Sequence, residues 1–472
     1  MSHHHHKKKE THHLKQLLVF LFGLSLWFLP TPPGLSIEAW HLFAIFISII
    51  LAVIIEATSI FTASIIGLGF VIITHTLSPQ QAYSGFSQSF ILLIIVAFLI
   101  ARGVIKSGLG KRIAFLIIKR FGKSSLGLGY SMVAADILIA PAFPSNTARS
   151  GVLYPILQAL AADSGSKVSN GTRKKLGAYL MMTSMAGLTI SSAMWLTAMA
   201  ANPIGAKIAK DFGVEISYAS WALAASLPSL LAFLVIPWLL FKVFPPEIKE
   251  TPDATQIATQ ELKHMGPIHK NEYIMAATFV VMITLWVLSE FLGIDKTAVA
   301  FLGLSVLMLS NIFTLDDLAH EGRALGTLIW FATLYTMSSY LNEFGFMAWL
   351  GEHISAIIAG YSWPLVYAGL IISYVLIHYF FVSQTAQMLA LFSVFLGVGV
   401  DAGVPAELLA FMLLFATNFS AMITPQGSSA NVIYLSSGYV ESREVYKYGG
   451  LVTLTNTVIY LGAGTAWILL VL

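Results

Sequence analysis

Two short polar motifs lie inside long apolar stretches of this 472-residue chain, at 125–163 and 362–400. They are Ser145, Asn146 and Thr147 in the first stretch and Ser383, Gln384 and Thr385 in the second. The hydroxyls of Ser and Thr and the amides of Asn and Gln can all donate hydrogen bonds to carboxylate oxygens. A motif that also begins a helix adds free backbone N–H groups and a partial positive charge. The two motifs therefore predict a site for a small diacid, with one carboxylate held by each motif.

Each motif also indicates the element that carries it. Polar backbone inside lipid must find partners in protein or in a wet cavity. We therefore expect a re-entrant hairpin in each stretch, made of two half-length helices with the motif at the tip, and we expect the two tips to meet near the membrane midplane. A single Ser-Asn-Thr sequence is more simply a helix cap, but two motifs in matched settings favour a binding role.

A second pair of features follows the hairpins, because the helices predicted over 174–212 and 405–438 are interrupted by small and polar residues. The candidate binding residues there are Thr197 and Asn202 in the first break and Pro425, Gly427 and Asn431 in the second. Ser383 follows Ser145 by 238 residues, and Asn431 follows Asn202 by 229. Two paired features at nearly one offset indicate an internal duplication. Discontinuous elements at matching positions of two halves are typical of a transporter's binding site.

Two basic residues lie close to the tips. Arg149 follows the first motif by two residues, and His378 precedes the second by five. A charge at membrane depth is usually functional. Arg149 could pair with a substrate carboxylate, directly or through a neighbour. The alternative is that it neutralises Asp136 in the other hairpin arm. For His378, the sequence favours a satisfied core histidine.

Composition identifies an all-α polytopic membrane protein. Hydrophobic residues make up 57% of the chain and charged residues 10%, with a mean hydropathy of +0.79, whereas soluble domains carry about 25% charged residues. The apolar runs allow about eleven transmembrane helices. The sequence has no Cys and no nucleophile–base or metal-ligand motif, so we expect no enzyme, no catalytic residue, no cofactor and no nucleic-acid partner. Re-entrant loops also build ion channels, but two inverted repeats favour a carrier.

The apolar runs divide the chain into two halves around a polar linker. The predicted segments are a cytoplasmic tail or tag (1–13), a leading transmembrane helix (14–36), a first repeat (37–244), the cytoplasmic linker (245–270) and a second repeat (271–472). Each half contains an odd number of spans, so the repeats are inverted. With a cytoplasmic N-terminus, every Lys and Arg lies inside except Lys207, Lys210, Lys296 and the tip residue Arg149, as the positive-inside rule requires. No transit peptide is recognised, which favours the plasma membrane.

These motifs resemble those of the divalent anion:sodium symporter (DASS) family, and the resemblance covers nearly the whole chain. The first motif matches the family's first signature, and the second matches with Gln384 where many members have Asn. The segment 424–431 resembles the family's second broken-helix motif. The resemblance implies a homodimer in the lipid membrane, with separate scaffold and transport domains and an elevator movement. It also implies substrates such as succinate, malate, fumarate and 2-oxoglutarate, with citrate, tartrate and sulfate in other members.

The main departure from the family pattern concerns the cation. Sodium-coupled members hold Na⁺ near each tip with Ser and Asn side chains and backbone carbonyls, whereas this chain has Arg149 and His378 there. We therefore predict that Arg149 and His378 replace the charge of the mobile cation and that no metal is bound. A fixed cation leaves the empty carrier charged, and moving a charge through a low-dielectric barrier is costly. We therefore predict Na⁺-independent antiport of di- or tricarboxylates, similar to the exchanger branch of the family. The alternative is Na⁺-coupled dicarboxylate symport.

Overall fold

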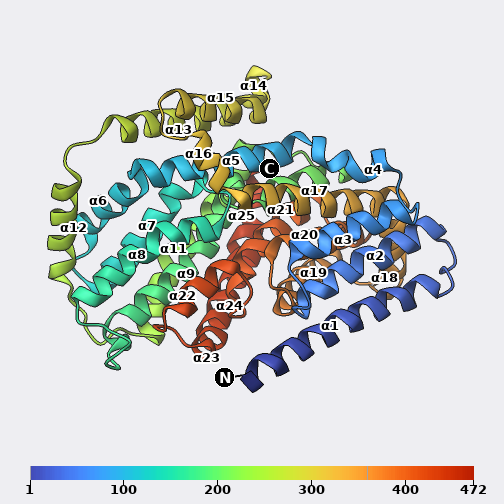
Figure 1. The fold of residues 1–472 in the computed structure, drawn as a ribbon, viewed down its shortest axis with the longest axis horizontal. Helices are drawn as coiled ribbons and strands as arrows, with labels where there is room; N and C mark the ends of the chain where they lie inside the picture. Colours follow the sequence, from blue (N-terminus) through green and yellow to red (C-terminus); the bar gives the residue numbers. More distant parts are fainter. Residues whose placement is uncertain (1, 359) are drawn as a thin grey trace. The chain divides into compact units, whose positions relative to one another are not determined.

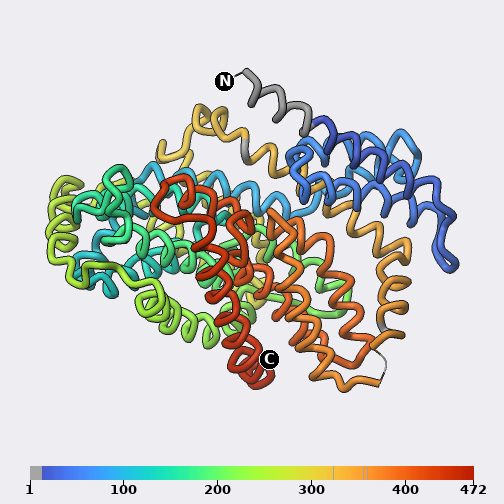
Figure 2. The backbone as a smooth tube through the Cα atoms, turned by 90° about the horizontal axis from the view of Figure 1, so that it is seen from below, coloured from blue at the N-terminus to red at the C-terminus, as the bar shows by residue number. Residues whose placement is uncertain are grey.

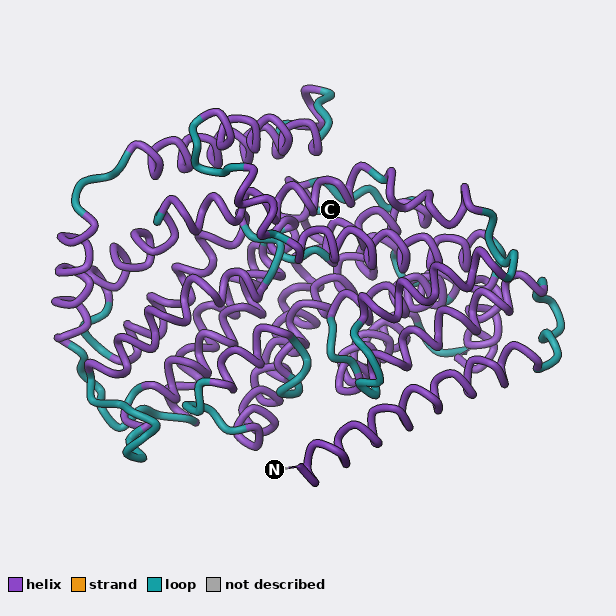
Figure 3. The backbone as a smooth tube through the Cα atoms, in the orientation of Figure 1, coloured by secondary structure: helices purple, strands orange, loops and turns teal. Residues whose placement is uncertain are grey.

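The computed structural model describes residues 2–358 and 360–472 of the chain, and that part consists of helices joined by loops, with no strand (Figure 3). The all-α prediction is confirmed. Short polar residues set the helix starts: the hydroxyls of Ser36, Ser59 and Ser124 each accept a hydrogen bond from the backbone N–H three residues later. Such N-caps satisfy donors that the first helical turn leaves open.

The chain divides into two compact units. The first unit comprises Met1–Ile95, Ile204–Val214 and Gly322–Ala410, and the second comprises Val96–Pro203, Glu215–Glu321 and Phe411–Leu472. Three helices have residues in both units: α5 (Ser89–Ser107), α10 (Ala201–Ala209) and α21 (Ala406–Phe419). Each unit is described by itself below.

The first unit contains eight further helices. They are α1 (Ser2–Phe28), α2 (Ile37–Ile54), α3 (Ile60–Ile73), α4 (Pro79–Tyr83), α17 (Gly322–Glu343), α18 (Phe346–Ile358), α19 (Trp363–Ile377) and α20 (Gln384–Asp401). Helices α1, α2 and α3 lie side by side (Figures 1 and 2), and α17 packs on both α2 and α3. Helix α1 includes most of the segment predicted as a tail, 1–13, of which Met1 lies outside the described residues.

The second unit contains the remaining α-helices that the structure describes. They are α6 (Leu109–Phe121), α7 (Ser125–Ile139), α8 (Asn146–Asp163), α9 (Gly177–Met194), α11 (Tyr218–Val243), α12 (Pro252–Met265), α13 (Lys270–Val287), α14 (Ser289–Leu292), α15 (Lys296–Leu309), α16 (Leu315–His320), α22 (Ser429–Ser436), α23 (Ser442–Glu444), α24 (Gly450–Ile459) and α25 (Thr465–Val471). Helix α9 packs on α7, α8 and α11, and α8 also contacts α22 (Figure 1). The polar linker predicted over 245–270 includes α12, which packs on α6. There the buried Arg112 Nε donates to Glu272 Oε1 at 2.6 Å.

Short 3₁₀ and π turns connect or extend these helices. The 3₁₀ turns are η1 (Ser84–Ser87), η2 (Ala140–Ala142), η3 (Arg173–Lys175), η4 (Leu196–Ala198), η5 (Lys210–Phe212), η6 (His378–Phe380) and η7 (Ser420–Met422), and the π turns are η8 (Val445–Gly449) and η9 (Tyr460–Gly464).

The two predicted hairpins repeat the same element lengths. Helices α7 and α19 each have 15 residues, and α8 and α20 each have 18. Each element of the second hairpin lies 238 residues after its counterpart, as from Ser125 to Trp363. At about 1.5 Å per residue, an 18-residue arm is about 27 Å long, close to the roughly 30 Å of a hydrocarbon core. The arms are therefore longer than the predicted half-length helices.

Both predicted helix breaks are present. Helix α9 ends at Met194; Trp195 and Met199 have extended backbone on either side of η4, and α10 begins at Ala201. In the second break α21 ends at Phe419, and α22 begins only after η7 and a loop.

Several described helices have the length and composition of membrane spans. Seven have at least 18 residues and an apolar window, and five further apolar helices are shorter. Together they make this chain a multi-pass membrane protein.

Candidate functional site

The first polar motif lies where α8 begins, in the second unit. Ser145 is the N-cap, with extended backbone (φ −150°, ψ 123°), and its Oγ accepts a hydrogen bond from Ala148 N at 3.3 Å. The other N–H groups of the first turn of α8 carry the partial positive charge of a helix N-terminus. The carbonyl of Pro144 accepts a hydrogen bond from Ala200 N at 3.1 Å. The tip is thereby fixed to the first helix break.

A second helix N-terminus lies against this tip in the same unit. Thr147 Oγ1 and Ser429 Oγ are 2.7 Å apart, and Ser429 is exposed. Ser428 is the N-cap of α22, and its Oγ accepts a hydrogen bond from Ala430 N at 3.3 Å. Two helix N-termini, each with a hydroxyl that can turn toward a ligand, therefore lie together. This arrangement suits one carboxylate group.

The guanidinium of Arg149 lies directly behind the first tip and is fully buried. Its Nη1 donates to the carbonyl oxygens of Phe143 and Ala198, at 3.0 and 2.6 Å. Its Nη2 donates to Asn146 Oδ1 at 2.7 Å and to Ser191 Oγ at 3.1 Å. Four neutral oxygen atoms from the tip and from the first broken helix therefore surround one fixed cation.

Arg149 also has an acidic partner. Its Nε donates to Asp136 Oδ1 at 2.9 Å, and Ser191 donates its hydroxyl to the other carboxylate oxygen. Asp136 and Arg149 are both buried and together carry no net charge. This contact matches the alternative in which Arg149 neutralises Asp136. The site therefore lacks the unbalanced positive charge on which the antiport prediction depended. The guanidinium still occupies the group of oxygen atoms at the tip.

The two asparagines predicted to bind substrate span the helix breaks instead. Asn202 Nδ2 donates to the carbonyl groups ten and seven residues earlier in the chain, at 2.9 and 3.2 Å. Asn431 Nδ2 donates to carbonyl groups at the same two separations and the same two distances. Asn418 Nδ2 donates to Asn202 Oδ1 at 2.7 Å, and Thr197 Oγ1 donates to Pro141 O at 2.9 Å. These side chains satisfy backbone groups that the interrupted helices leave open.

Pro425 and Gly427 lie buried in the loop that precedes α22. Gly427 N donates to Thr424 O at 3.2 Å. Neither residue has a polar side chain, so their contribution to a site is the backbone path that brings α22 toward the tip.

The second polar motif has the same local structure, in the first unit. Ser383 is the N-cap of α20 (φ −144°, ψ 123°), and its Oγ accepts a hydrogen bond from Ala386 N at 3.3 Å. These values nearly equal those of the first tip. Gln384 and Thr385 follow in the first turn and are buried.

His378 is fully buried next to this second tip. Its Nδ1 lies 2.5 Å from Gln387 Oε1, and Gln387 Nε2 donates to Tyr374 O at 2.7 Å. Because the amide nitrogen faces a carbonyl, the amide oxygen faces the ring, and Nδ1 is the donor. This contact matches the alternative of a satisfied core histidine. Gln387 follows Arg149 by 238 residues, so a neutral amide stands where the first hairpin has its cation.

Four side chains of this region were not among the predicted site residues: Ser191, Asn418, Ser428 and Ser429. Ser428 could have been recognised as a helix cap after the break. Ser191 and Asn418 lie on buried faces of apolar helices, where a polar side chain needs a partner, but their partners are distant in the sequence.

A polytopic helical protein with two matched hairpins and two interrupted helices belongs to the class of secondary transporters. The sequence profile of the family described as "Sodium:sulfate symporter transmembrane region" matches residues 10–472. The chain belongs to this family, which is a family of transporters and not of enzymes.

Relatives of known name resemble the chain over nearly its whole length. It is 42% identical to two relatives, over 453 and 459 residues. The longer match is to dicarboxylate transporter 1 of spinach (Spinacia oleracea) chloroplasts, and it covers 96% of this chain and 81% of the relative. It is 30% identical to the L-tartrate/succinate antiporter of Escherichia coli, covering 94% and 95%. The crystal structure of the YdaH transporter of Alcanivorax borkumensis matches with a TM-score of 0.59 at 13% identity, over 86% of this chain and 89% of that one. This structural match supports the fold alone.

Proposed function

We propose that the protein exchanges dicarboxylates such as succinate, malate, fumarate and 2-oxoglutarate across a membrane without Na⁺. Relatives at 42% and 30% identity are named for dicarboxylate transport and for tartrate/succinate antiport. The joined N-termini of α8 and α22 supply hydroxyl and backbone donors for one carboxylate. Within the first unit, the N-terminus of α20 has an equivalent set of donors.

The observation that carries this proposal is the position of Arg149. Carbonyl, amide and hydroxyl oxygens are the ligands that hard cations prefer. At the first tip the oxygens of Phe143, Ala198 and Asn146 already accept hydrogen bonds from the guanidinium. A Na⁺ ion at that place would have to displace a buried side chain that is also paired with Asp136. The tip therefore offers donors for an anion rather than acceptors for a cation.

Exchange is expected because the proposed site uses no mobile cation. Since Asp136 balances Arg149, the positive field that a substrate dianion meets comes from the helix N-termini. Without a mobile cation, a dianion that leaves is best replaced by a second dianion. Net charge movement is then zero over a full exchange cycle.

Sodium-coupled symport is the second candidate, and one observation favours it. Ser420 Oγ and Thr424 Oγ1, at the second helix break, are buried and have no hydrogen-bond partner within the described chain. Two such oxygens could contribute to a cation site. An uptake assay with and without Na⁺ separates symport from exchange.

The test is uptake of labelled succinate into liposomes that contain the purified protein. Vesicles preloaded with unlabelled succinate are compared with empty vesicles, each with a Na⁺ gradient or with choline in place of Na⁺. Exchange predicts uptake into preloaded vesicles only, at equal rates in Na⁺ and choline. Uptake into empty vesicles that requires Na⁺ would establish symport.

The resemblance to the family further supports a homodimer and an elevator movement of the substrate site. The odd number of spans expected in each half supports inverted repeats, and the distribution of Lys and Arg supports a cytoplasmic N-terminus; we also propose a plasma-membrane location. Topology can be tested directly, since the native chain has no Cys. Single cysteines in place of Lys119 and Lys210 are expected on opposite sides of the membrane. A membrane-impermeant maleimide applied to intact cells should label only the variant at Lys210.

A further inference from the structure

Helix α22 supplies one of the two helix N-termini at the first tip, but it is short. It has eight residues, and isolated helices below about 12–15 residues are marginal on their own. The chain before it is interrupted by the second helix break. The position of α22 therefore depends on its neighbours α8 and α9, on which it packs (Figure 1).

The contact at the start of α22 cannot fix its position while substrate is bound. Thr147 Oγ1 and Ser429 Oγ are 2.7 Å apart, and each hydroxyl has one hydrogen to donate. When both hydroxyls donate to a carboxylate, neither donates to the other. Another contact, farther along α22, must then hold the two N-termini at the distance that suits the carboxylate.

Tyr434 supplies such a contact. It is fully buried and follows Ser429 by about 7.5 Å along the helix axis. Its hydroxyl lies 3.0 Å from Ser184 Oγ of α9, and its ring packs edge to face on Tyr154 of α8, with the centroids 6.1 Å apart. Val432, on the opposite side of α22, is 53% exposed. The helix is therefore held from the face that carries Tyr434.

The hydroxyl of Tyr434 adds a constraint that its ring does not. A hydrogen bond holds two heavy atoms within a narrow range of distance and angle, whereas apolar contact is non-directional. Ser184 belongs to α9, and α9 packs on α8, the helix that carries Thr147. The phenol therefore fixes α22 relative to both helices.

We propose that Tyr434 is a positioning residue for the substrate carboxylate. Through Ser184, its hydroxyl sets the distance between the N-termini of α8 and α22, and so the fit of a carboxylate between Thr147 and Ser429. Tyr434 acts through α22, since its own side chain is buried away from the tip hydroxyls. The assignment rests on the proposed function, because it requires a carboxylate at these N-termini.

Two substitutions remove this hydrogen bond from its two sides. Tyr434→Phe deletes only the phenol oxygen, and Ser184→Ala deletes only the partner hydroxyl. The control for the tyrosine is Tyr460→Phe, because Tyr460 is equally buried in the same unit and its hydroxyl lies 2.9 Å from Ser229 Oγ of α11. The two tyrosines thus lose the same kind of bond, and only Tyr434 lies on the helix that forms the site.

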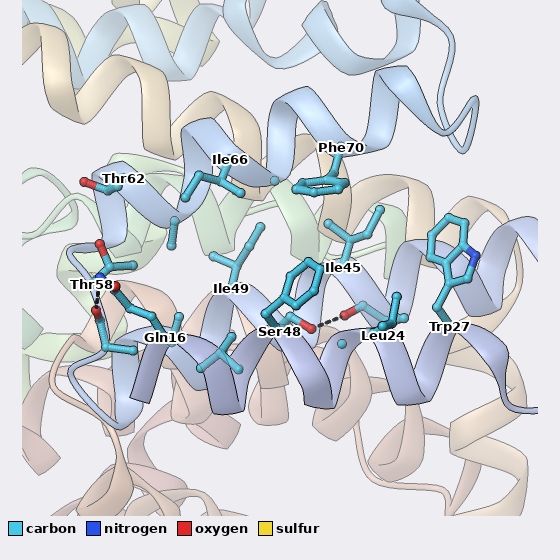
Figure 4. Close-up of a pocket in the computed structure, with 18 of the residues that line it drawn as sticks. Gln16, Leu24, Trp27, Ile45, Ser48, Ile49, Thr58, Thr62, Ile66 and Phe70 are labelled. Atoms are coloured by element: carbon cyan, nitrogen blue, oxygen red, sulfur yellow. Dashed lines mark hydrogen bonds between the residues drawn. The ribbon is translucent and has the colours of Figure 1, made fainter. Parts of the chain in front are cut away.

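The control for the serine is Ser48→Ala. The hydroxyl of Ser48 donates to Ala44 O on its own helix, α2, at 2.6 Å. It lies in a groove between α1 and α3 in the first unit (Figure 4). This groove shares no residue with either tip, so the loss of the Ser48 hydroxyl should not change substrate affinity.

Exchange of labelled succinate in liposomes would measure KM and the maximal rate, and thermal unfolding in detergent would measure stability. Tyr434→Phe and Ser184→Ala should each raise KM about fivefold with little change in the maximal rate. Tyr460→Phe should lower the unfolding temperature as much as Tyr434→Phe does, yet leave KM unchanged. Ser48→Ala should match the wild type in KM.

A double-variant cycle separates positioning from a merely structural role. Ser429→Ala should raise KM about tenfold by itself. If the phenol acts by placing the start of α22, Tyr434→Phe should add no more than about twofold once the Ser429 hydroxyl is gone. A tyrosine that only stabilises the fold would give independent effects, which multiply.

An unchanged KM in Tyr434→Phe and Ser184→Ala, or effects that multiply in the double variant, would overturn the assignment. Because the two single variants test one bond from either side, loss of folding in one of them still leaves the other to decide. A wild type that transports no succinate, in Na⁺ or in choline, would instead overturn the proposed function and the assignment with it. Transport by the wild type with an unchanged KM in both variants would overturn the assignment alone.

Discussion

Arg149 Nε lies 2.9 Å from Asp136 Oδ1, and both side chains are buried in the second unit. The pair is neutral, yet its guanidinium takes up hydrogen-bond acceptors of the tip and of the first helix break. A buried ion pair of this kind contributes little net stability as a unit, but removing one partner leaves an uncompensated charge. Arg149 therefore fixes the shape of the tip, and Asp136 compensates the charge of the guanidinium, which would otherwise destabilise the fold in a low-dielectric environment.

Asp136→Asn should destabilise the fold by about 3–5 kcal/mol, because it leaves the guanidinium without its partner. Thermal unfolding of the purified protein in detergent would measure the change. The double variant Asp136→Asn/Arg149→Gln should recover much of the loss, since no buried charge remains. Asp253→Asn, at an exposed position of α12, is the matched control. A double variant less stable than Asp136→Asn would contradict the pairing argument.

Replacing Arg149 alone should change the ion dependence of transport. Arg149→Gln leaves Asp136 and the oxygens of Asn146, Phe143 and Ala198 without the guanidinium. This set resembles the oxygen ligands of a hard cation. We expect exchange of labelled succinate to fall in choline and to recover in part when Na⁺ is added, whereas the wild type is indifferent to Na⁺.

The control for this experiment is Arg120→Gln, at an exposed position near the end of α6. It should remain indifferent to Na⁺. If Arg149→Gln has equal residual activity in Na⁺ and in choline, the guanidinium does not stand in the place of a cation.

The hydroxyls of Thr147 and Ser429 should each contribute to substrate affinity. They are 2.7 Å apart at two helix N-termini, and a hydrogen bond to a charged group contributes about 1.5–3 kcal/mol, so Thr147→Val or Ser429→Ala should raise the KM for succinate about tenfold or more. Ser436→Ala is the control, because that hydroxyl donates only to Ile433 O on the same helix. An unchanged KM in both tip variants would place the carboxylate elsewhere.

The class of fold and the two interruptions could be predicted from the sequence because both depend on local patterns. Apolar runs define helices, and small and polar residues inside such runs mark the places where helices end. The contact between Thr147 and Ser429 could not be predicted in this way, since it joins residues 282 positions apart.

The sequence leaves two alternatives open for the partner of Arg149, for a similar reason. Thirteen residues separate it from Asp136, and this spacing places them on opposite hairpin arms without fixing the rotation of either arm. Asn202 and Asn431 illustrate a different limit. An amide can serve a ligand or a broken backbone equally well, and residue type alone does not separate the two uses.

Asn202→Ala and Asn431→Ala should both destabilise the protein, and Asn202→Ala should have the larger effect. Each asparagine donates to two carbonyl groups at the same two distances, and Asn202 Oδ1 also accepts from the buried Asn418 Nδ2. Each orphaned buried group costs about 1–3 kcal/mol. Thermal unfolding in detergent would measure both, with Asn271→Ala at an exposed position of α13 as the control. A large effect at one asparagine and none at the other would contradict the equivalence of the two breaks.

The ion pair between Lys106 and Asp317 should make stability depend on pH in a defined window. Lys106 Nζ lies 2.6 Å from Asp317 Oδ2, and the hydrogen bond from Lys106, with others from Thr314, lowers the pKa of Asp317 to about 2. An unfolded Asp has a pKa of about 3.9. Because the folded pKa is the lower one, the carboxylate stabilises the fold fully above pH ~4 and loses this contribution as the pH falls toward 2.

The measurement compares thermal unfolding of the wild type and Asp317→Asn from neutral pH down to pH ~3. The wild type should be the more stable by a constant margin above pH ~5, and the margin should shrink below pH ~4 as Asp317 becomes protonated. Asp316→Asn is the control, because the neighbouring carboxylate is 86% exposed and should follow the wild type throughout. A margin that stays constant through the acid range would mean that the Asp317 carboxylate is not stabilised by Lys106, since only a folded pKa below the unfolded one makes the difference vanish in acid.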